Sequence, residues 1–93
     1  MPMNIETASI TNANAGDLLA EGRAAIARGE FDFDLSAVAE VDTAAVALLL
    51  EWQRQAIAQG GRLRLRGVPA DVTSLARLYG VAGLLDLDAR AAT

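Results

Sequence analysis

The chain has 93 residues, enough for one domain, and we assign residues 1–93 to a single domain. Its 53% hydrophobic and 22% charged residues are typical of a globular protein, and its formal net charge of −4 disfavours binding to nucleic acid or directly to an anionic membrane. Cysteine, histidine and lysine are absent, which removes disulfides, the commonest metal ligands and the usual general base, so we expect no catalytic residue, no metal site and no cofactor.

The same composition favours a cytoplasmic protein. Residues 1–5 lack a basic segment followed by an apolar run, so we expect no secretory signal. The apolar residues are interrupted too often by polar ones to form a spanning helix. The lack of cysteine fits a reducing compartment. We therefore expect a soluble protein of the cytoplasm.

The first third of the chain predicts a strand, a helix and a second strand. Residues 5–10 alternate poorly and form only a weak strand. Residues 17–27 place leucine and isoleucine at helical spacing, with Gly22 as a weak point and Gly29 as the stop. Residues 31–35 alternate strictly between apolar side chains and aspartate, which predicts a strand with one buried face.

The middle of the chain predicts a long helix followed by another strand. The helix spans residues 43–59 and ends at two consecutive glycines. Residues 62–66 then alternate between arginine and leucine, which predicts a strand with one solvent-exposed face. Because a helix joins them, this strand and the strand at residues 31–35 should lie parallel.

The last part of the chain predicts a helix and a short strand. Pro69 and Gly80 bound a helix at residues 70–79, residues 84–87 predict the last strand, and residues 89–93 should fray. The fold class is therefore α/β, a mixed sheet of about four strands with helices packed mainly on one face.

Two short motifs resemble the STAS family of small bacterial domains that act as protein–protein switches. They are Asp34-Leu35-Ser36 after a strand and Val41-Asp42-Thr43-Ala44-Ala45 at a helix start. The resemblance extends from about Ile5 to the end of the chain. Within the family, later segments are most similar to the MlaB-type STAS subunits of phospholipid-transporting ABC complexes. These segments are Gln59-Gly60-Gly61, Gly67-Val68-Pro69 and Leu75-Ala76-Arg77-Leu78-Tyr79-Gly80.

This resemblance implies a non-enzymatic regulatory or scaffold protein that binds the cytoplasmic ATPase of an ABC phospholipid transporter, and that reaches the membrane only indirectly through that complex. It places the partner at the start of the second helix, on Asp42, Thr43, Ala44, Ala45, Leu48 and Trp52. The chain departs from the family at its N-terminus. STAS domains usually begin with a strand pair before the first helix, whereas this sequence has room for little more than one strand there, so we expect a shortened N-terminal strand region.

The alternative function that the resemblance implies is an anti-sigma factor antagonist, a STAS branch that works by partner switching on a kinase-type anti-sigma factor. In that branch the phosphorylated hydroxyl stands two positions after the aspartate, at a position that is Ala44 here. Alanine accepts no phosphate, so Ala44 argues against this switch. Thr43 and Ser36 are the candidate phosphate acceptors of this region.

Asp42 and Thr43 also have an interpretation as helix-start residues. An oxygen of Asp42 can accept hydrogen bonds from the first turn, and its charge favours the positive end of the helix dipole. The Thr43 hydroxyl can cap the helix or face a partner, and the same dipole end favours phosphate. A small hydrolase using Asp42, Thr43 and Glu40 is a weak third hypothesis, because no visible base activates the hydroxyl.

The second helix is apolar over a wider arc than contact with one sheet needs. Leu48 and Trp52 extend past one edge of a face that consists of Ala45, Val46, Leu49, Leu50, Gln53, Ala56 and Ile57. Either a neighbouring helix covers Leu48 and Trp52, or the two residues form an exposed patch beside Thr43 that suits a partner.

Charged residues of opposite sign alternate on the two central strands. Arg62, Arg64 and Arg66 line one face of a strand, and Asp32 and Asp34 line the expected neighbour. We expect cross-strand ion pairs, with phosphate binding as the lesser alternative. The sequence has no glycine-rich loop of the kind that cradles phosphates.

Overall fold

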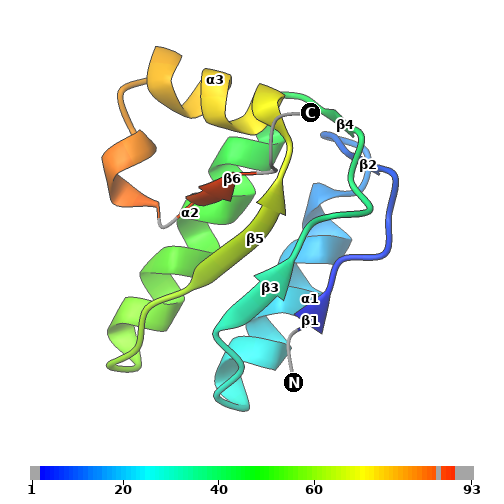
Figure 1. Ribbon diagram of the computed structural model, residues 1–93. Helices are drawn as coiled ribbons and strands as arrows, with labels where there is room; N and C mark the ends of the chain where they lie inside the picture. The colour runs from blue at the N-terminus through cyan, green and yellow to red at the C-terminus, as the bar shows by residue number, and fades with distance from the viewer. Residues whose placement is uncertain (1–2, 86, 90–93) are drawn as a thin grey trace.

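The computed structural model describes residues 3–85 and 87–89, which form an α/β fold with the helices on one face of a sheet (Figure 1). The larger sheet has the order β1-β3-β5-β6 and consists of β1 (Met3–Asn4), β3 (Asp32–Asp34), β5 (Arg64–Val68) and β6 (Leu87–Ala89). A second sheet pairs β2 (Ser9–Ile10) with β4 (Glu40–Val41). The helices are α1 (Ala15–Ala27), α2 (Thr43–Ala58) and α3 (Ala70–Leu78), followed by the 3-10 helix η1 (Ala82–Leu84).

Both sheets are parallel, which corrects the prediction of a single mixed sheet. Within the described residues, β1 pairs with β3, β3 with β5, β5 with β6, and β2 with β4, each in parallel. A helix lies in the chain between the members of every pair and returns the chain to the same end of the sheet. The predicted parallel pairing of the two central strands is confirmed.

The N-terminal region contains two short strands, whereas the sequence predicted one weak strand at residues 5–10. β1 lies before that segment and β2 at its end, and each belongs to a different sheet. Ile5 and Ile10 are both buried, and the Ile5 amide donates to the Asp34 carbonyl at 2.9 Å. Because the chain passes from one sheet to the other between Ile5 and Ile10, residues 5–10 do not show one regular alternation of buried and exposed side chains. The strand β4 was missed because it has two residues.

The C-terminal elements also differ from the prediction of a strand at residues 84–87. Ala82 to Leu84 form η1, and the strand β6 begins at Leu87. Asp86 and residues 90–93, on which part of that prediction and the expected frayed end fall, lie outside the described residues.

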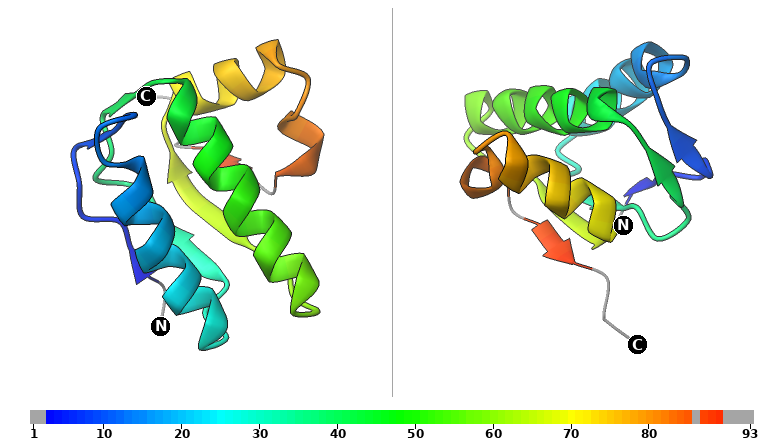
Figure 2. Two further views of the ribbon diagram at one scale, coloured as in Figure 1. Left: turned by 180° about the vertical axis from the view of Figure 1, so that it is seen from behind. Right: turned by 90° about the horizontal axis from the view of Figure 1, so that it is seen from above.

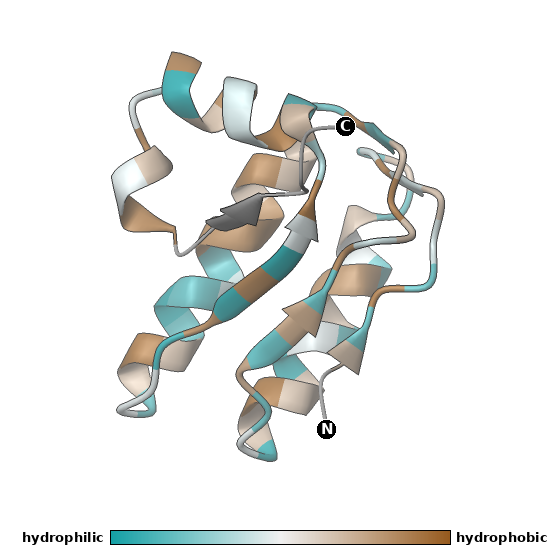
Figure 3. Cartoon of the chain, viewed as in Figure 1, coloured by the Kyte–Doolittle hydropathy of each residue, from teal (hydrophilic) through white to brown (hydrophobic). Residues whose placement is uncertain are grey.

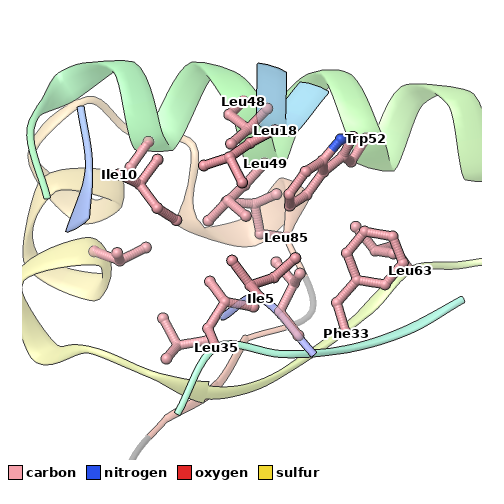
Figure 4. Packing of buried hydrophobic residues seen from close by; sticks show 14 of the residues in the cluster. Ile5, Ile10, Leu18, Phe33, Leu35, Leu48, Leu49, Trp52, Leu63 and Leu85 are labelled. Carbon is pink, nitrogen blue, oxygen red and sulfur yellow. The ribbon is translucent and has the colours of Figure 1, made fainter. Parts of the chain in front are cut away.

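The hydrophobic core lies between the larger sheet and the helices α1 and α2, which run side by side and begin at the same end of the domain (Figure 2). Trp52 of α2 and Phe33 of β3 face each other across this core (Figure 4). Their ring centroids are 4.9 Å apart and their planes are inclined by 74°, an edge-to-face contact. This contact fixes α2 over the central strands.

The sheet face opposite the helices is polar, as the strict alternation predicted. Figure 3 shows hydrophilic and hydrophobic residues alternating along β5. In the β3–β5 register Asp32 faces Arg64 and Asp34 faces Arg66. A guanidinium nitrogen of Arg66 lies 2.8 Å from Asp32 Oδ2, which confirms the expected cross-strand ion pairing. An exposed pair of this kind contributes about 0–1 kcal/mol.

Gly22, in the middle of α1, is the point where the indole of Trp52 packs against the helix. A Cβ atom built at Gly22 overlaps Cε2 and Nε1 of Trp52. The indole nitrogen donates a hydrogen bond to the Leu19 carbonyl at 3.2 Å. The glycine that weakens the helix pattern is therefore the residue that lets α1 approach Trp52.

Gly22→Ala is accordingly expected to lower the free energy of unfolding by about 1–3 kcal/mol, the usual effect of overpacking. The same change in an open helix raises stability by about 1 kcal/mol. Gly16→Ala is the matched control in α1, because a Cβ there meets nothing within 4 Å, and it should leave stability unchanged or slightly raised. Urea unfolding followed by circular dichroism measures both. An equal increase in the free energy of unfolding of both variants would contradict the close packing of Trp52 against Gly22.

Candidate functional site

A groove of about 460 Å³ lies between the first turns of α1 and α2. Small and apolar side chains dominate its lining, with polar groups at its rim. The lining residues are Asn12, Ala15, Gly16, Leu19, Asp42, Thr43, Ala44, Ala47, Leu48 and Glu51. We call this feature the α1–α2 groove. It brings together two helix starts that are about 28 residues apart in the sequence.

Asp42 holds the two sides of the groove together. It is the N-cap of α2, with extended backbone at φ −122° and ψ −169°, and its Oδ1 accepts from the Ala44 amide at 2.8 Å. Its Oδ2 accepts from the Asn12 amide at 3.1 Å, in the loop before α1. Its own amide donates to the Ile10 carbonyl at 3.2 Å. The predicted capping role is confirmed, and the same carboxylate also anchors the opposite wall of the groove.

Thr43 is the first residue of α2 and is exposed at the rim of the α1–α2 groove, next to the half-buried Ala44. A hydrolytic use of this threonine needs a neighbouring base. Both oxygens of Asp42 already accept backbone N–H groups, and Glu40 is not among the residues that line the groove. The geometry therefore favours a binding surface over the weak hydrolase hypothesis.

Trp52 and Leu48 are buried, so the interpretation in which a neighbouring helix covers them holds and the exposed patch is wrong. Trp52 has 0% of its surface exposed and Leu48 has 4%. The indole lies against α1, where its nitrogen reaches the Leu19 carbonyl. Leu48 still contributes to the floor of the α1–α2 groove, whereas Trp52 does not line it. Trp52 is a core residue and not an accessible anchor.

Two other residues of α2 also differ from the predictions, one from the family resemblance and one from the helical pattern. Ala45, placed by resemblance on the partner surface, is 0% exposed and points into the core. Ile57, placed on the buried side, is 55% exposed near the end of the helix. Its neighbour Ala56 is 0% exposed, so the buried face of α2 continues into the last turn without Ile57.

Sequence reasoning missed the α1 wall of the groove and two positions on α2. The missed residues are Asn12, Ala15, Gly16, Leu19, Ala47 and Glu51. A signal for them does exist in the sequence. Small or apolar residues recur three and four positions apart at the start of each helix, which places them on one face. That pattern shows a shared face but does not show that the two faces adjoin.

Ser36, the other candidate phosphate acceptor, lies away from the groove in the turn after β3. Asp34 Oδ1 accepts from the Ser36 amide at 2.8 Å and also from its hydroxyl. Gly67 of β5 has φ +63°, and a Cβ there would crowd the side chain and backbone of Ser36. The Asp34-Leu35-Ser36 motif therefore builds a tight turn against β5, and Thr43 and Ser36 belong to different surfaces.

Over residues 3–85 and 87–89, no three acidic side chains gather as metal ligands would. None of the helices in this part of the chain combines the length and the apolar character needed to cross a bilayer.

A parallel α/β domain whose capped helix start borders an apolar groove is suited to binding another protein. The family model described as "Mlab, STAS domain" matches residues 7–86, and the chain belongs to this family of MlaB-type STAS domains. The family resemblance is thereby confirmed. STAS domains generally mediate protein–protein interaction and are generally not catalytic. A comparison with curated proteins found no match.

Proposed function

We propose that this protein is a non-enzymatic regulatory or scaffold subunit that binds the cytoplasmic ATPase of an ABC phospholipid transporter. The observation that carries the proposal is the α1–α2 groove beside the capped start of α2, in a chain of the MlaB-type family. The protein works on the cytoplasmic side and meets the membrane only through the complex.

The shape and lining of the α1–α2 groove suit a side chain that projects from a partner helix. Ala15, Gly16, Ala44 and Ala47 are short, so a partner backbone can approach the two helices closely. Leu48 provides an apolar floor for an aliphatic anchor. Interfaces concentrate their binding energy in such central, desolvated contacts.

The proposed contact residues divide into those that position the groove and those that touch the partner. Asp42 positions the two helix starts through its hydrogen bonds to Ala44 and Asn12. Thr43, Ala44 and Leu48 face the groove and contact the partner directly. This division gives each member of the helix-start motif a separate role.

The second candidate function is the anti-sigma factor antagonist that binds a kinase-type anti-sigma factor through the same surface. The exposure of Thr43 at the first residue of α2 favours it, since the positive end of the helix dipole stabilises a phosphate there. The residue at the usual acceptor position is Ala44, which cannot carry phosphate. The transporter subunit is therefore the preferred function.

Purification of the native complex from the host separates the two functions. We expect an ATPase subunit to copurify in stoichiometric amount and residues 36–45 to carry no phosphate, as measured by intact-mass and peptide mass spectrometry. The contact should survive moderate salt, because apolar burial is little screened. Stoichiometric phosphate on Thr43 or Ser36 together with a kinase-like partner would overturn the transporter function in favour of the switch.

A further inference from the structure

Two arginines share one carboxylate on the outer seam between α1 and α2. Arg54 Nη1 lies 2.8 Å from Glu51 Oε1, and Arg23 Nη2 lies 3.8 Å from Glu51 Oε2. Both arginine side chains are largely exposed, at 77% for Arg54 and 54% for Arg23. One negative charge therefore faces two positive charges, which leaves a local positive excess on a protein whose net charge is −4.

These arginines border a hollow of about 440 Å³, lined by Arg23, Glu51, Arg54, Gln55 and Ala58. We call it the basic hollow. Gln55 Nε2 donates to the Arg23 carbonyl at 3.0 Å, so the two helices are tied together beneath it. Glu51 lines both the basic hollow and the α1–α2 groove, so the two depressions adjoin at this residue.

The donors of the basic hollow suit a carboxylate. Each guanidinium offers five N–H donors in a planar fork, and the contacts with Glu51 use only part of this capacity. A second carboxylate placed between Arg23 and Arg54 would alternate the charges around the hollow and balance them. Oppositely charged surfaces of this kind set the orientation of a partner more than its total affinity.

The spacing along α2 sets the spacing required of the partner. Leu48, in the floor of the groove, and Arg54, at the hollow, are six residues apart. At 1.5 Å per residue this is about 9 Å along the helix axis. On a partner helix lying along the seam, two side chains of one face about seven positions apart span roughly 10 Å.

We propose that the partner presents a helix with an aliphatic anchor for the α1–α2 groove and an Asp or Glu about two turns away, whose carboxylate binds between Arg23 and Arg54. This inference rests on the proposed function, because it names the chemistry of the partner at that same site. The acidic residue fixes the direction in which the partner helix lies across α1 and α2.

The test uses the ATPase subunit purified from the native complex as the probe. In a binding titration, the double variant Arg23→Glu with Arg54→Glu should bind it at least about tenfold more weakly than the unchanged protein. The charge-matched control is Arg64→Glu with Arg77→Glu, two exposed arginines away from the seam, and it should stay within about twofold. Thermal unfolding of both double variants verifies that the fold is kept.

The outcomes distinguish this inference from the function on which it rests. If the purified ATPase does not bind the unchanged protein, the proposed function itself fails. If the ATPase binds the unchanged protein and both double variants have the same affinity for it, the proposed acidic anchor is contradicted. The groove then remains the proposed binding site. Replacing the partner's acidic residue by arginine should restore binding to the Arg23→Glu, Arg54→Glu variant, and a failure to restore it would also contradict the pairing.

Discussion

Thr43→Glu is expected to abolish binding of the partner while leaving the domain folded. Thr43 is exposed at the rim of the α1–α2 groove, so the new carboxylate would be enclosed by the partner without a compensating charge. An unpaired charge in a closed contact costs about 2–5 kcal/mol, enough to remove a moderate interaction. Titration of the variant against the purified ATPase measures the loss.

The fold should tolerate Thr43→Glu because of the position of this residue in the helix. Thr43 is the first residue of α2, where a negative side chain meets the positive end of the helix dipole and adds about 0.3–1 kcal/mol. Ser74→Glu, an exposed hydroxyl replaced on α3, is the control and should bind normally. Unchanged affinity of Thr43→Glu would remove the helix start from the interface, and unfolding of the variant would show a structural role.

Trp52→Ala is expected to lower the free energy of unfolding by about 3–5 kcal/mol, the usual loss for a large aromatic core residue. The indole is fully buried, packs edge-to-face on Phe33 and donates to the Leu19 carbonyl. The total free energy of unfolding of a small domain is about 5–15 kcal/mol, so the variant should be close to unfolding. Ile57→Ala on the same helix is the control, because Ile57 is 55% exposed, and it should change stability by about 0.5 kcal/mol or less.

The fluorescence of Trp52 tests the same packing without a substitution. Trp52 is the only tryptophan of the chain, so emission reports on it alone. In the unbound protein the emission maximum should already be blue-shifted, as for an indole shielded from water, and it should not change when the ATPase is added. An emission maximum that lies at long wavelength in the unbound protein and shifts to the blue on binding would instead show that Trp52 belongs to the interface.

The contrast between Thr43 and Trp52 shows where the interface reading of the sequence failed. Both residues lie on α2 within three turns, and the family resemblance placed both on the partner surface. Thr43 is exposed, whereas α1 covers Trp52, because Gly22 leaves room for the indole. The packing partner of Trp52 is some 30 residues away in the chain, and periodicity within one helix carries no information about it.

The sequence by itself determined the features that neighbouring residues produce. Asp42 was expected to cap α2 because a carboxylate at a helix start can reach the next amides, and it does so. The alternation of Asp32 and Arg66 on their strands predicted an ion pair that forms. The motifs around Asp42 were also enough to indicate the STAS family.

Only the tertiary structure decided how separate elements adjoin. It placed a strand of the larger sheet before residues 5–10 and a strand of the second sheet at their end, made both sheets parallel and packed α1 against α2. The α1–α2 groove and the basic hollow both exist because α1 packs against α2, which brings Asn12 and Arg23 next to residues of α2 that are far away in the sequence. Local hydrogen bonds and periodicity are properties of consecutive residues, whereas the packing of one face on another depends on the shape and volume of the whole core.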